Sequence, residues 1–167
     1  MKTIVLPGYS TKNKEWAENV KKELPGIDIE IIEWQHWSNP QIKWNARNEA
    51  ARIVEKFGQE KFNVIAKSLG TLVFAKLLSN NYQIVNKAIL CGIPINDMDE
   101  NDKSEYKTFS DLVSENAIVF QNSEDGHGNF ESVRRFLSQY NPNIKIVEKP
   151  GSTHDYPYFE DFKEFLG

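Results

Sequence analysis

The sequence predicts an α/β protein in which helices cover both faces of a mostly parallel sheet. Six short apolar runs alternate along the 167 residues with stretches of amphipathic, helical character, an order typical of parallel strands joined by helices. The runs 3–6 and 117–120 are apolar almost throughout, as expected for strands that are buried on both sides. We therefore expect a three-layer sandwich that residues 1–167 form as one domain.

The first half of the chain begins with two pairs of a strand and a helix. The β-type run 3–6 predicts the first strand, and the amphipathic run 13–24 predicts the helix after it. The run 28–33 predicts the second strand. Pro40 interrupts the tryptophan-rich stretch that follows, so we expect a loop there before a helix over 45–57.

The third strand and its helix meet at a serine. The apolar strand expected at 62–66 ends abruptly in Ser68, and a helical pattern over 69–78 begins at once. Two small residues, Ala66 and Gly70, frame the serine. This arrangement fits the nucleophile elbow G-x-S-x-G, with alanine in the first position.

The elbow pattern has a physical purpose. The serine takes a strained backbone conformation there, and its neighbours crowd the strand and the helix, so only small residues fit. The helix N-terminus offers free N–H groups to a developing oxyanion. Ser68 could instead be a simple helix cap. A phosphate-binding loop is excluded, because it requires glycine where Ala66 and Lys61 stand.

The second half of the chain continues the alternation. We expect strands at 87–91, 117–121 and 144–148, and helices over 109–114, 130–139 and 158–166. The acidic segment 93–108 is too short for a lid domain and is expected to be a solvated, flexible loop. Its acidic run faintly resembles a calcium loop, but Asp102 and Thr108 stand where such a loop needs glycine and glutamate. We expect neither a metal nor a cofactor.

Ligands of parallel α/β sheets bind outside the carboxyl ends of the strands, so the residues directly after each strand are candidates for a site. These residues include Ser68, Asp125 and His154, in the chain order Ser, Asp, His that α/β-hydrolases use. With its Ala66-Lys67-Ser68-Leu69-Gly70 elbow, the chain resembles the α/β-hydrolase superfamily, specifically its small single-domain serine hydrolases. The resemblance covers nearly the whole chain.

The resemblance implies a six-stranded sheet in the order 2-1-3-4-5-6, as in a minimal α/β-hydrolase without a lid domain. It also implies a carboxylesterase-like serine hydrolase with Ser68 as nucleophile, His154 as base and Asp125 as acid. Asn122 stands where the family usually has glycine before the acid. The first strand ends in Leu6-Pro7-Gly8, as in members of the retinoblastoma-binding-protein type.

The expected chemistry explains why these residue types are needed. A serine hydroxyl is a poor nucleophile until a base takes its proton, and a carboxylate orients the histidine that does so. The N–H groups of Leu69 and Tyr9 are the expected oxyanion donors. We expect Gly8, Trp34 and Trp37 to line an apolar substrate pocket.

Several roles stay open at the level of the sequence. Asp97 follows the fourth strand and is an alternative acid. His36 is expected to rim a pocket, and His127 to be solvated in a flexible turn. Lys67 stands where related elbows usually have histidine. It could favour an anionic substrate, or it could be structural, with a packed stem and its charge in water.

We expect a small-molecule ester or thioester as substrate, and long-chain lipids are disfavoured. The alternatives are a binding or regulatory module on a hydrolase fold, or an amidase or acyltransferase with the same triad. A net charge of -4 and a pI near 5.5 argue against nucleic-acid and anionic-membrane partners. The single cysteine, Cys91, and the short N-terminal apolar run 3–6 predict a cytoplasmic protein. The oligomeric state stays open.

Overall fold

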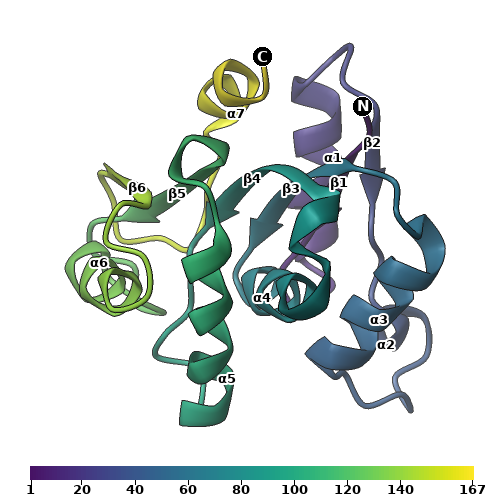
Figure 1. Cartoon of the computed structure of the whole chain (residues 1–167), viewed down its shortest axis with the longest axis horizontal. Helices are drawn as coiled ribbons and strands as arrows, with labels where there is room; N and C mark the ends of the chain where they lie inside the picture. The colour runs from purple at the N-terminus through teal and green to yellow at the C-terminus, as the bar shows by residue number, and fades with distance from the viewer.

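The computed structural model describes residues 1–167, with side chains for all but residues 80–82. Over this described chain, six strands form one sheet in the order β2-β1-β3-β4-β5-β6 (Figure 1). Every neighbouring pair is parallel, which confirms the predicted topology. The strands are β1 (Thr3–Leu6), β2 (Ile29–Ile31), β3 (Phe62–Lys67), β4 (Val85–Cys91), β5 (Ala117–Asn122) and β6 (Lys145–Lys149).

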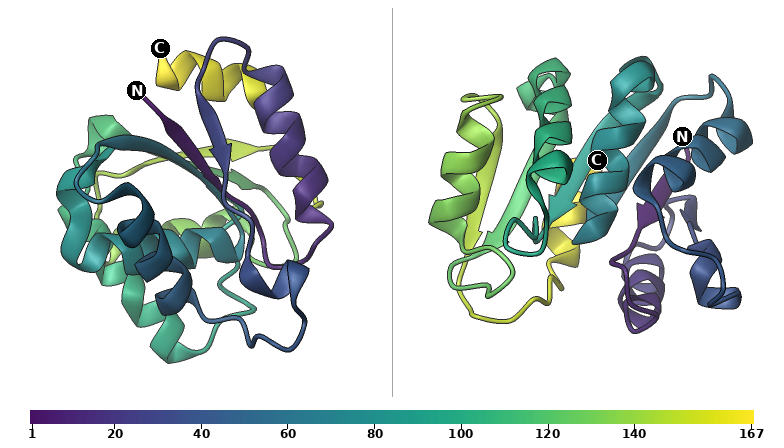
Figure 2. Two further views of the ribbon diagram at one scale, coloured as in Figure 1. Left: turned by 90° about the vertical axis from the view of Figure 1, so that its right-hand side faces the viewer. Right: turned by 90° about the horizontal axis from the view of Figure 1, so that it is seen from below.

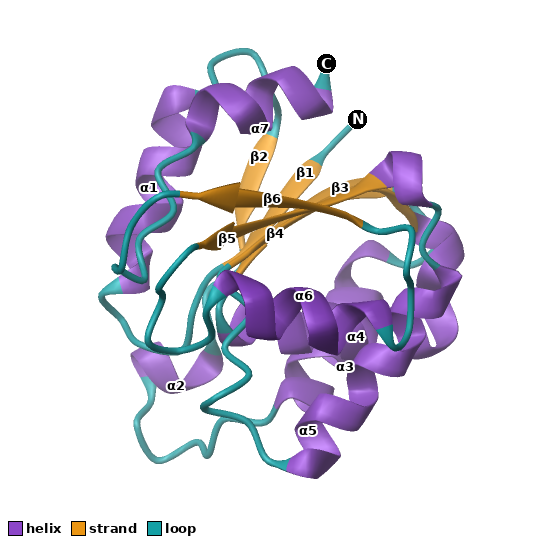
Figure 3. Cartoon of the chain, turned by 90° about the vertical axis from the view of Figure 1, so that its left-hand side faces the viewer, coloured by secondary structure: helices purple, strands orange, loops and turns teal.

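Helices cover both faces of the sheet, as Figure 3 shows from the side. One face carries α1 (Asn13–Glu23) and α7 (Phe159–Leu166). The other face carries α2 (Gln35–Ser38), α3 (Ala46–Phe57), α4 (Leu69–Asn81), α5 (Glu100–Ser104) and α6 (Phe130–Ser138). Three short 3₁₀ helices complete the chain: η1 (Tyr82–Ile84), η2 (Glu105–Asp111) and η3 (Ser114–Asn116).

The two layers of helices enclose two separate clusters of core residues. Side chains alternate between the faces of a strand, so in β3 Val64 and Ala66 pack in the larger cluster with α3 and α4. Ile65 points the other way and packs with α1 and α7. The same alternation places Lys67, the last residue of β3, on the α1 side of the sheet.

The acidic segment after β4 differs from the prediction. The helix expected over 109–114 is wrong in position, because the helical residues here begin earlier, with α5 at Glu100 and η2 at Glu105. Asp99 caps α5 by accepting a hydrogen bond from Asp102 N–H at 2.8 Å, and acidic residues are favourable in the first turn of a helix. Tyr106 and Phe109 are fully buried and anchor η2 in the core. Residues 100–108 of this segment are therefore helical, whereas a loop was expected.

The loop expected after β2 also contains a short helix, α2, between Trp34 and Asn39. Other boundaries agree closely with the prediction, because capping residues fix them. Asn45 accepts a hydrogen bond from Asn48 N–H at 3.1 Å and begins α3, and Asn129 accepts one from Ser132 N–H at 2.8 Å and begins α6.

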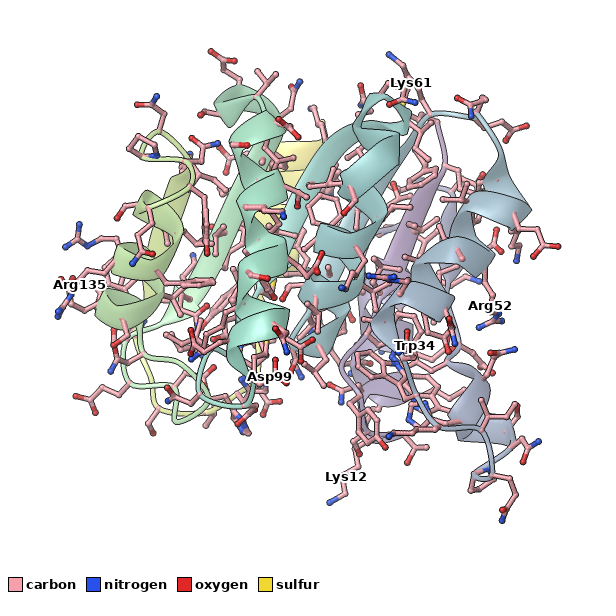
Figure 4. The ribbon with its side chains drawn as sticks, turned by 60° about the horizontal axis from the view of Figure 1, so that its bottom comes forward. Lys12, Trp34, Arg52, Lys61, Asp99 and Arg135 are labelled. Carbon is pink, nitrogen blue, oxygen red and sulfur yellow. The ribbon has the colours of Figure 1, made fainter. Side chains whose placement is uncertain are left out.

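The parallel order brings the carboxyl ends of all strands to one edge of the sheet. In Figure 4, Lys61, which directly precedes β3, lies at the opposite end of the molecule from Lys12 and Asp99, which follow β1 and β4. Both chain termini lie at the amino-terminal edge (Figure 2). No helix of the described chain is long and apolar enough to span a bilayer.

Candidate active site

Ser68 sits at the sharp turn from β3 to α4 in a strained conformation. Its φ is 54°, the only positive φ outside glycine in the described chain, and such values are costly for residues with a side chain. The turn is held from both sides. Ser68 N–H donates to Cys91 O at 2.9 Å, and Ser68 O accepts from Thr71 N–H at 2.8 Å and from Thr71 Oγ1 at 2.7 Å. The surrounding hydrogen bonds thus maintain the strain.

Gly70 lets the first turn of α4 approach the end of β1. A Cβ atom at this position would lie inside the contact distance of Leu6 O and 2.7 Å from Pro7 O. Both obstacles are backbone atoms, which cannot move aside cheaply. Ala66, two residues before the serine, is fully buried, so a methyl group is accommodated where the elbow pattern usually has glycine. The small residues around Ser68 therefore fix the elbow against β1.

Asp125 and His154 form a hydrogen-bonded pair at the same edge of the sheet. His154 Nδ1 lies 2.6 Å from Asp125 Oδ2. The carboxylate is completely buried and receives two more hydrogen bonds, from Tyr156 Oη at 2.6 Å to Oδ2 and from His127 N–H at 2.9 Å to Oδ1. Asp125 follows β5 and His154 follows β6, so the fold itself places the two side chains together.

The environment of Asp125 keeps it ionised. Burial raises the pKa of the carboxyl group, but the hydrogen bonds from His154, Tyr156 and His127 N–H outweigh it and hold the pKa below its usual range. Burial is also the largest cause that raises the pKa of the Tyr156 hydroxyl. Tyr156 therefore stays protonated and acts as a donor to the acid. Sequence reasoning did not find this role, and no local motif signals it.

His154 directs its second ring nitrogen away from the acid. Nε2 is buried and has no hydrogen-bond partner among the described side chains, so it makes no hydrogen bond with Ser68 Oγ in this structure. Gly92, at the turn after β4, lies close to the ring, because a Cβ atom there would be 3.0 Å from His154 Cε1. The glycine leaves the space that the imidazole and the Tyr156 ring occupy.

The loop after β1 is held by donors from the segment around α2. Trp34 Nε1 donates to Gly8 O at 3.1 Å, and Trp37 Nε1 donates to Tyr9 O at 2.8 Å. His36 Nε2 lies 3.0 Å from the same Tyr9 carbonyl. Fixing the carbonyl groups fixes the peptide planes, and with them the direction of the loop N–H groups. Among the described residues, neither Tyr9 N–H nor Leu69 N–H has an acceptor.

The aromatic residues near this loop differ in how much surface they offer a substrate. Trp34 is only 1% exposed, so its side chain presents almost nothing to a ligand, contrary to the pocket role expected from the sequence. Trp37 is half-buried. The exposed Tyr9 stacks on His36 with ring centroids 4.5 Å apart, beside a hollow of about 470 Å³ that His36 and Trp44 also line.

Asp97, the alternative acid, pairs with a different histidine. Asp97 Oδ2 lies 2.5 Å from His127 Nδ1, and both side chains are about half exposed. The His127 ring in turn lies against the ring of His154, with centroids 4.2 Å apart. The site thus contains two adjacent Asp–His pairs. The sequence placed His127 in a solvated turn and gave no sign of this contact beyond its position two residues after Asp125.

Lys67 is more deeply buried than expected for a lysine whose ammonium group lies in water. The residue is 5% exposed, and its Nζ donates to Asn13 Oδ1 at 2.9 Å and lies 5.5 Å from the centre of the Trp16 ring. Burial lowers the pKa of the ammonium group, while the negative charges of Asp155 and Asp125 act in the opposite direction. Both ends of this side chain are therefore inside the protein.

Comparison with known proteins defines the class to which this fold and site belong. The family described as the alpha/beta hydrolase fold matches residues 7–160, so the chain belongs to the alpha/beta hydrolase family. No protein among the curated sequences matches the chain.

Solved structures share the fold at low sequence identity. A serine hydrolase homologue from Coxiella burnetii has a TM-score of 0.72 at 19% identity, over 99% of this chain and 83% of that one. A serine hydrolase without a lid from Xanthomonas campestris has a TM-score of 0.68 at 14% identity, over 99% and 78%. Est816, an enzyme that degrades N-acyl homoserine lactones, has a TM-score of 0.72 at 11% identity, over 99% and 92%.

Proposed function

We propose that this protein is a serine hydrolase that cleaves a small carboxylic ester or thioester through an acyl-enzyme. The observation that carries the proposal is the buried Asp125–His154 pair, at the same sheet edge as the strained Ser68. A carboxylate bonded to Nδ1 fixes the tautomer in which Nε2 can accept a proton. Membership of the alpha/beta hydrolase family supports the same reading.

In the proposed reaction, Ser68 Oγ bonds to the substrate carbonyl carbon while its proton passes to His154 Nε2. The carbonyl electron pair moves to the oxygen, which the N–H groups of Leu69 and Tyr9 stabilise. Collapse of this intermediate breaks the bond to the alcohol or thiol, which takes the proton from His154. Water then attacks the acyl-Ser68 ester with His154 as base, and the carboxylic acid leaves with Ser68 regenerated.

The site also favours small substrates. The segment after β4, which larger relatives would use for a lid, forms only the short helices α5 and η2 here. Est816 acts on lactones, which are cyclic esters, so a panel of acetyl esters, acetyl thioesters and lactones is the appropriate first set. Assays with an added amine or alcohol distinguish hydrolysis from amide cleavage or acyl transfer by their products.

A fluorophosphonate probe, followed by peptide mass spectrometry, tests the proposal directly. We expect labelling at Ser68 that is lost in His154→Ala, with labelling retained in Ser138→Ala, an exposed serine on α6. A folded protein that is not labelled, and that hydrolyses nothing in the panel, would overturn the proposal. It would favour a binding module on the hydrolase fold, an alternative consistent with the unpartnered His154 Nε2.

A further inference from the structure

At the carboxyl edge of the sheet, a cleft lies between the N-terminal part of α1 and the segment that leads into α7. Its volume is about 540 Å³. The lining includes Asn13, Trp16, Lys67, His154 and Tyr156, so the residue that supplies the proposed base forms part of the cleft wall. Its lining residues come from α1, the end of β3 and the segment before α7, and Figure 3 shows α1 and α7 on the face of the sheet opposite α4.

Lys67 supplies a positive charge to this cleft. Its ammonium group has three N–H donors, but Asn13 Oδ1 is the one acceptor that it has among the described residues. No carboxylate of the described chain lies within 4.0 Å of Lys67 Nζ. Buried lysines are normally paired with an anion. Lys67 is 5% exposed and lines the cleft. An anion bound in the cleft would therefore give its ammonium group the hydrogen-bond acceptors and the negative charge that it lacks.

The charges at the rim limit the kind of anion. Lys12 projects at this edge of the molecule (Figure 4), while Glu15 and Asp155 also line the cleft. Two carboxylates so close would repel a polyphosphate or another multiply charged group. A single carboxylate meets less of this repulsion, and the charge of Lys67 offsets it.

We propose that this cleft binds a carboxylate on the leaving group of the substrate, and that Lys67 recognises it. The leaving atom takes its proton from His154 in the proposed reaction, so the leaving group lies beside a residue that also borders the cleft, and its far end extends into the cleft. The substrates are therefore esters or thioesters whose alcohol or thiol half carries a carboxylate. This inference rests on the proposed function and specifies the substrate class of the same site.

The test compares two thioesters that differ in one charge. They are S-acetyl-3-mercaptopropionate and its methyl ester, and release of the thiol is followed for both. We expect wild type to favour the charged substrate in kcat/KM by about tenfold, a modest value for a hydrogen bond to a charged group. Lys67→Met, which keeps the length of the side chain, brings this ratio close to one. Lys12→Met, which removes an exposed lysine from the same cleft, retains most of it.

A binding measurement needs no variant at position 67 and no turnover. Trp16 Nε1 donates to Tyr156 O at 3.0 Å inside the cleft wall, so its NMR signal reports on occupancy. In Ser68→Ala, this signal should shift with added S-acetyl-3-mercaptopropionate and not with its methyl ester.

The two proposals fail in different ways. Ser68-dependent hydrolysis of both thioesters at equal efficiency by wild type, or a preference that survives in folded Lys67→Met, would overturn the carboxylate site and leave the hydrolase intact. Selective binding of the charged thioester, without any hydrolysis by wild type, would overturn the hydrolase and leave the carboxylate site.

Discussion

His127 lies against His154, with ring centroids 4.2 Å apart and an angle of 42° between the rings. Asp97 is hydrogen-bonded to His127, and Asp125 is hydrogen-bonded to His154. The two Asp–His pairs are therefore in contact at the carboxyl edge of the sheet. The contact with the His127 ring limits the rotation of the His154 ring, which a hydrogen bond at Nδ1 alone does not do.

We expect His127→Ala to lower kcat about tenfold. A residue that only positions the base should contribute no more to the rate than general base catalysis itself does. His127→Phe keeps a flat ring over His154 and should retain more of kcat than the alanine variant. Steady-state kinetics on an acetyl thioester measures both. Equal losses in the two variants would mean that the contact between the rings is not the reason for the effect.

Asp125 and Asp97 should differ sharply when each is changed to asparagine. Loss of the triad carboxylate in a serine protease lowers kcat by about 10⁴-fold, and we expect Asp125→Asn to approach this value if Asp125 has the proposed role. Asp97→Asn should cost far less, because Asp97 contacts His127 and not His154. Comparison of kcat for the two variants decides which aspartate is the acid, and a reversed order would contradict the assignment.

Gly70→Ala should destabilise the fold by about 2–4 kcal/mol, since the added methyl group meets immobile backbone atoms. Gly126→Ala is the matched control, because a Cβ atom at Gly126 has no neighbour within 4 Å. Urea unfolding gives both values. Similar midpoints for the two variants would show that β1 and α4 do not meet as closely as described.

The stability of the protein should depend on pH through Lys67. Burial lowers the pKa of Lys67 from its ordinary value of 10.5, so between the two values the unfolded chain binds more protons than the folded one. The free energy of unfolding of wild type should therefore rise with pH in this alkaline window relative to that of Lys67→Met. Urea unfolding of both proteins at several pH values up to about 10 measures the difference.

Lys12→Met, at an exposed position, should run parallel to wild type in the same experiment. A constant difference between wild type and Lys67→Met across the window would contradict the burial of the ammonium group. The measurement does not depend on enzymatic activity, so it tests the burial of Lys67 separately from the proposed function.

The sequence predicts the sheet well because its signals are local. Each strand is a short apolar run, and the elbow around Ser68 is defined by small residues two positions away on either side. The predicted strand order was confirmed, with only parallel pairs in the described chain. The helix after β4 was misplaced because an acidic run suggests a solvated loop, whereas capping by Asp99 and burial of Tyr106 decide the structure.

The surroundings of the site depend on contacts between segments that are distant in sequence. Trp34 looked like a pocket residue, but its indole donates to a carbonyl 26 positions earlier. Lys67 Nζ finds Asn13 over an even longer separation of 54 positions. Periodicity carries no information about such contacts. The catalytic roles of Ser68, Asp125 and His154 stay predictions until the probe and the variants are examined.

The bonds from Trp34 and Trp37 to the loop after β1 give this protein an internal optical reporter. Indole emission responds to the strength of the N–H hydrogen bond, and here two indoles are tied to the carbonyls of Gly8 and Tyr9. A change in the loop during acylation would therefore alter the fluorescence without any added dye. Stopped-flow mixing with a substrate could follow the first turnover in the unlabelled protein.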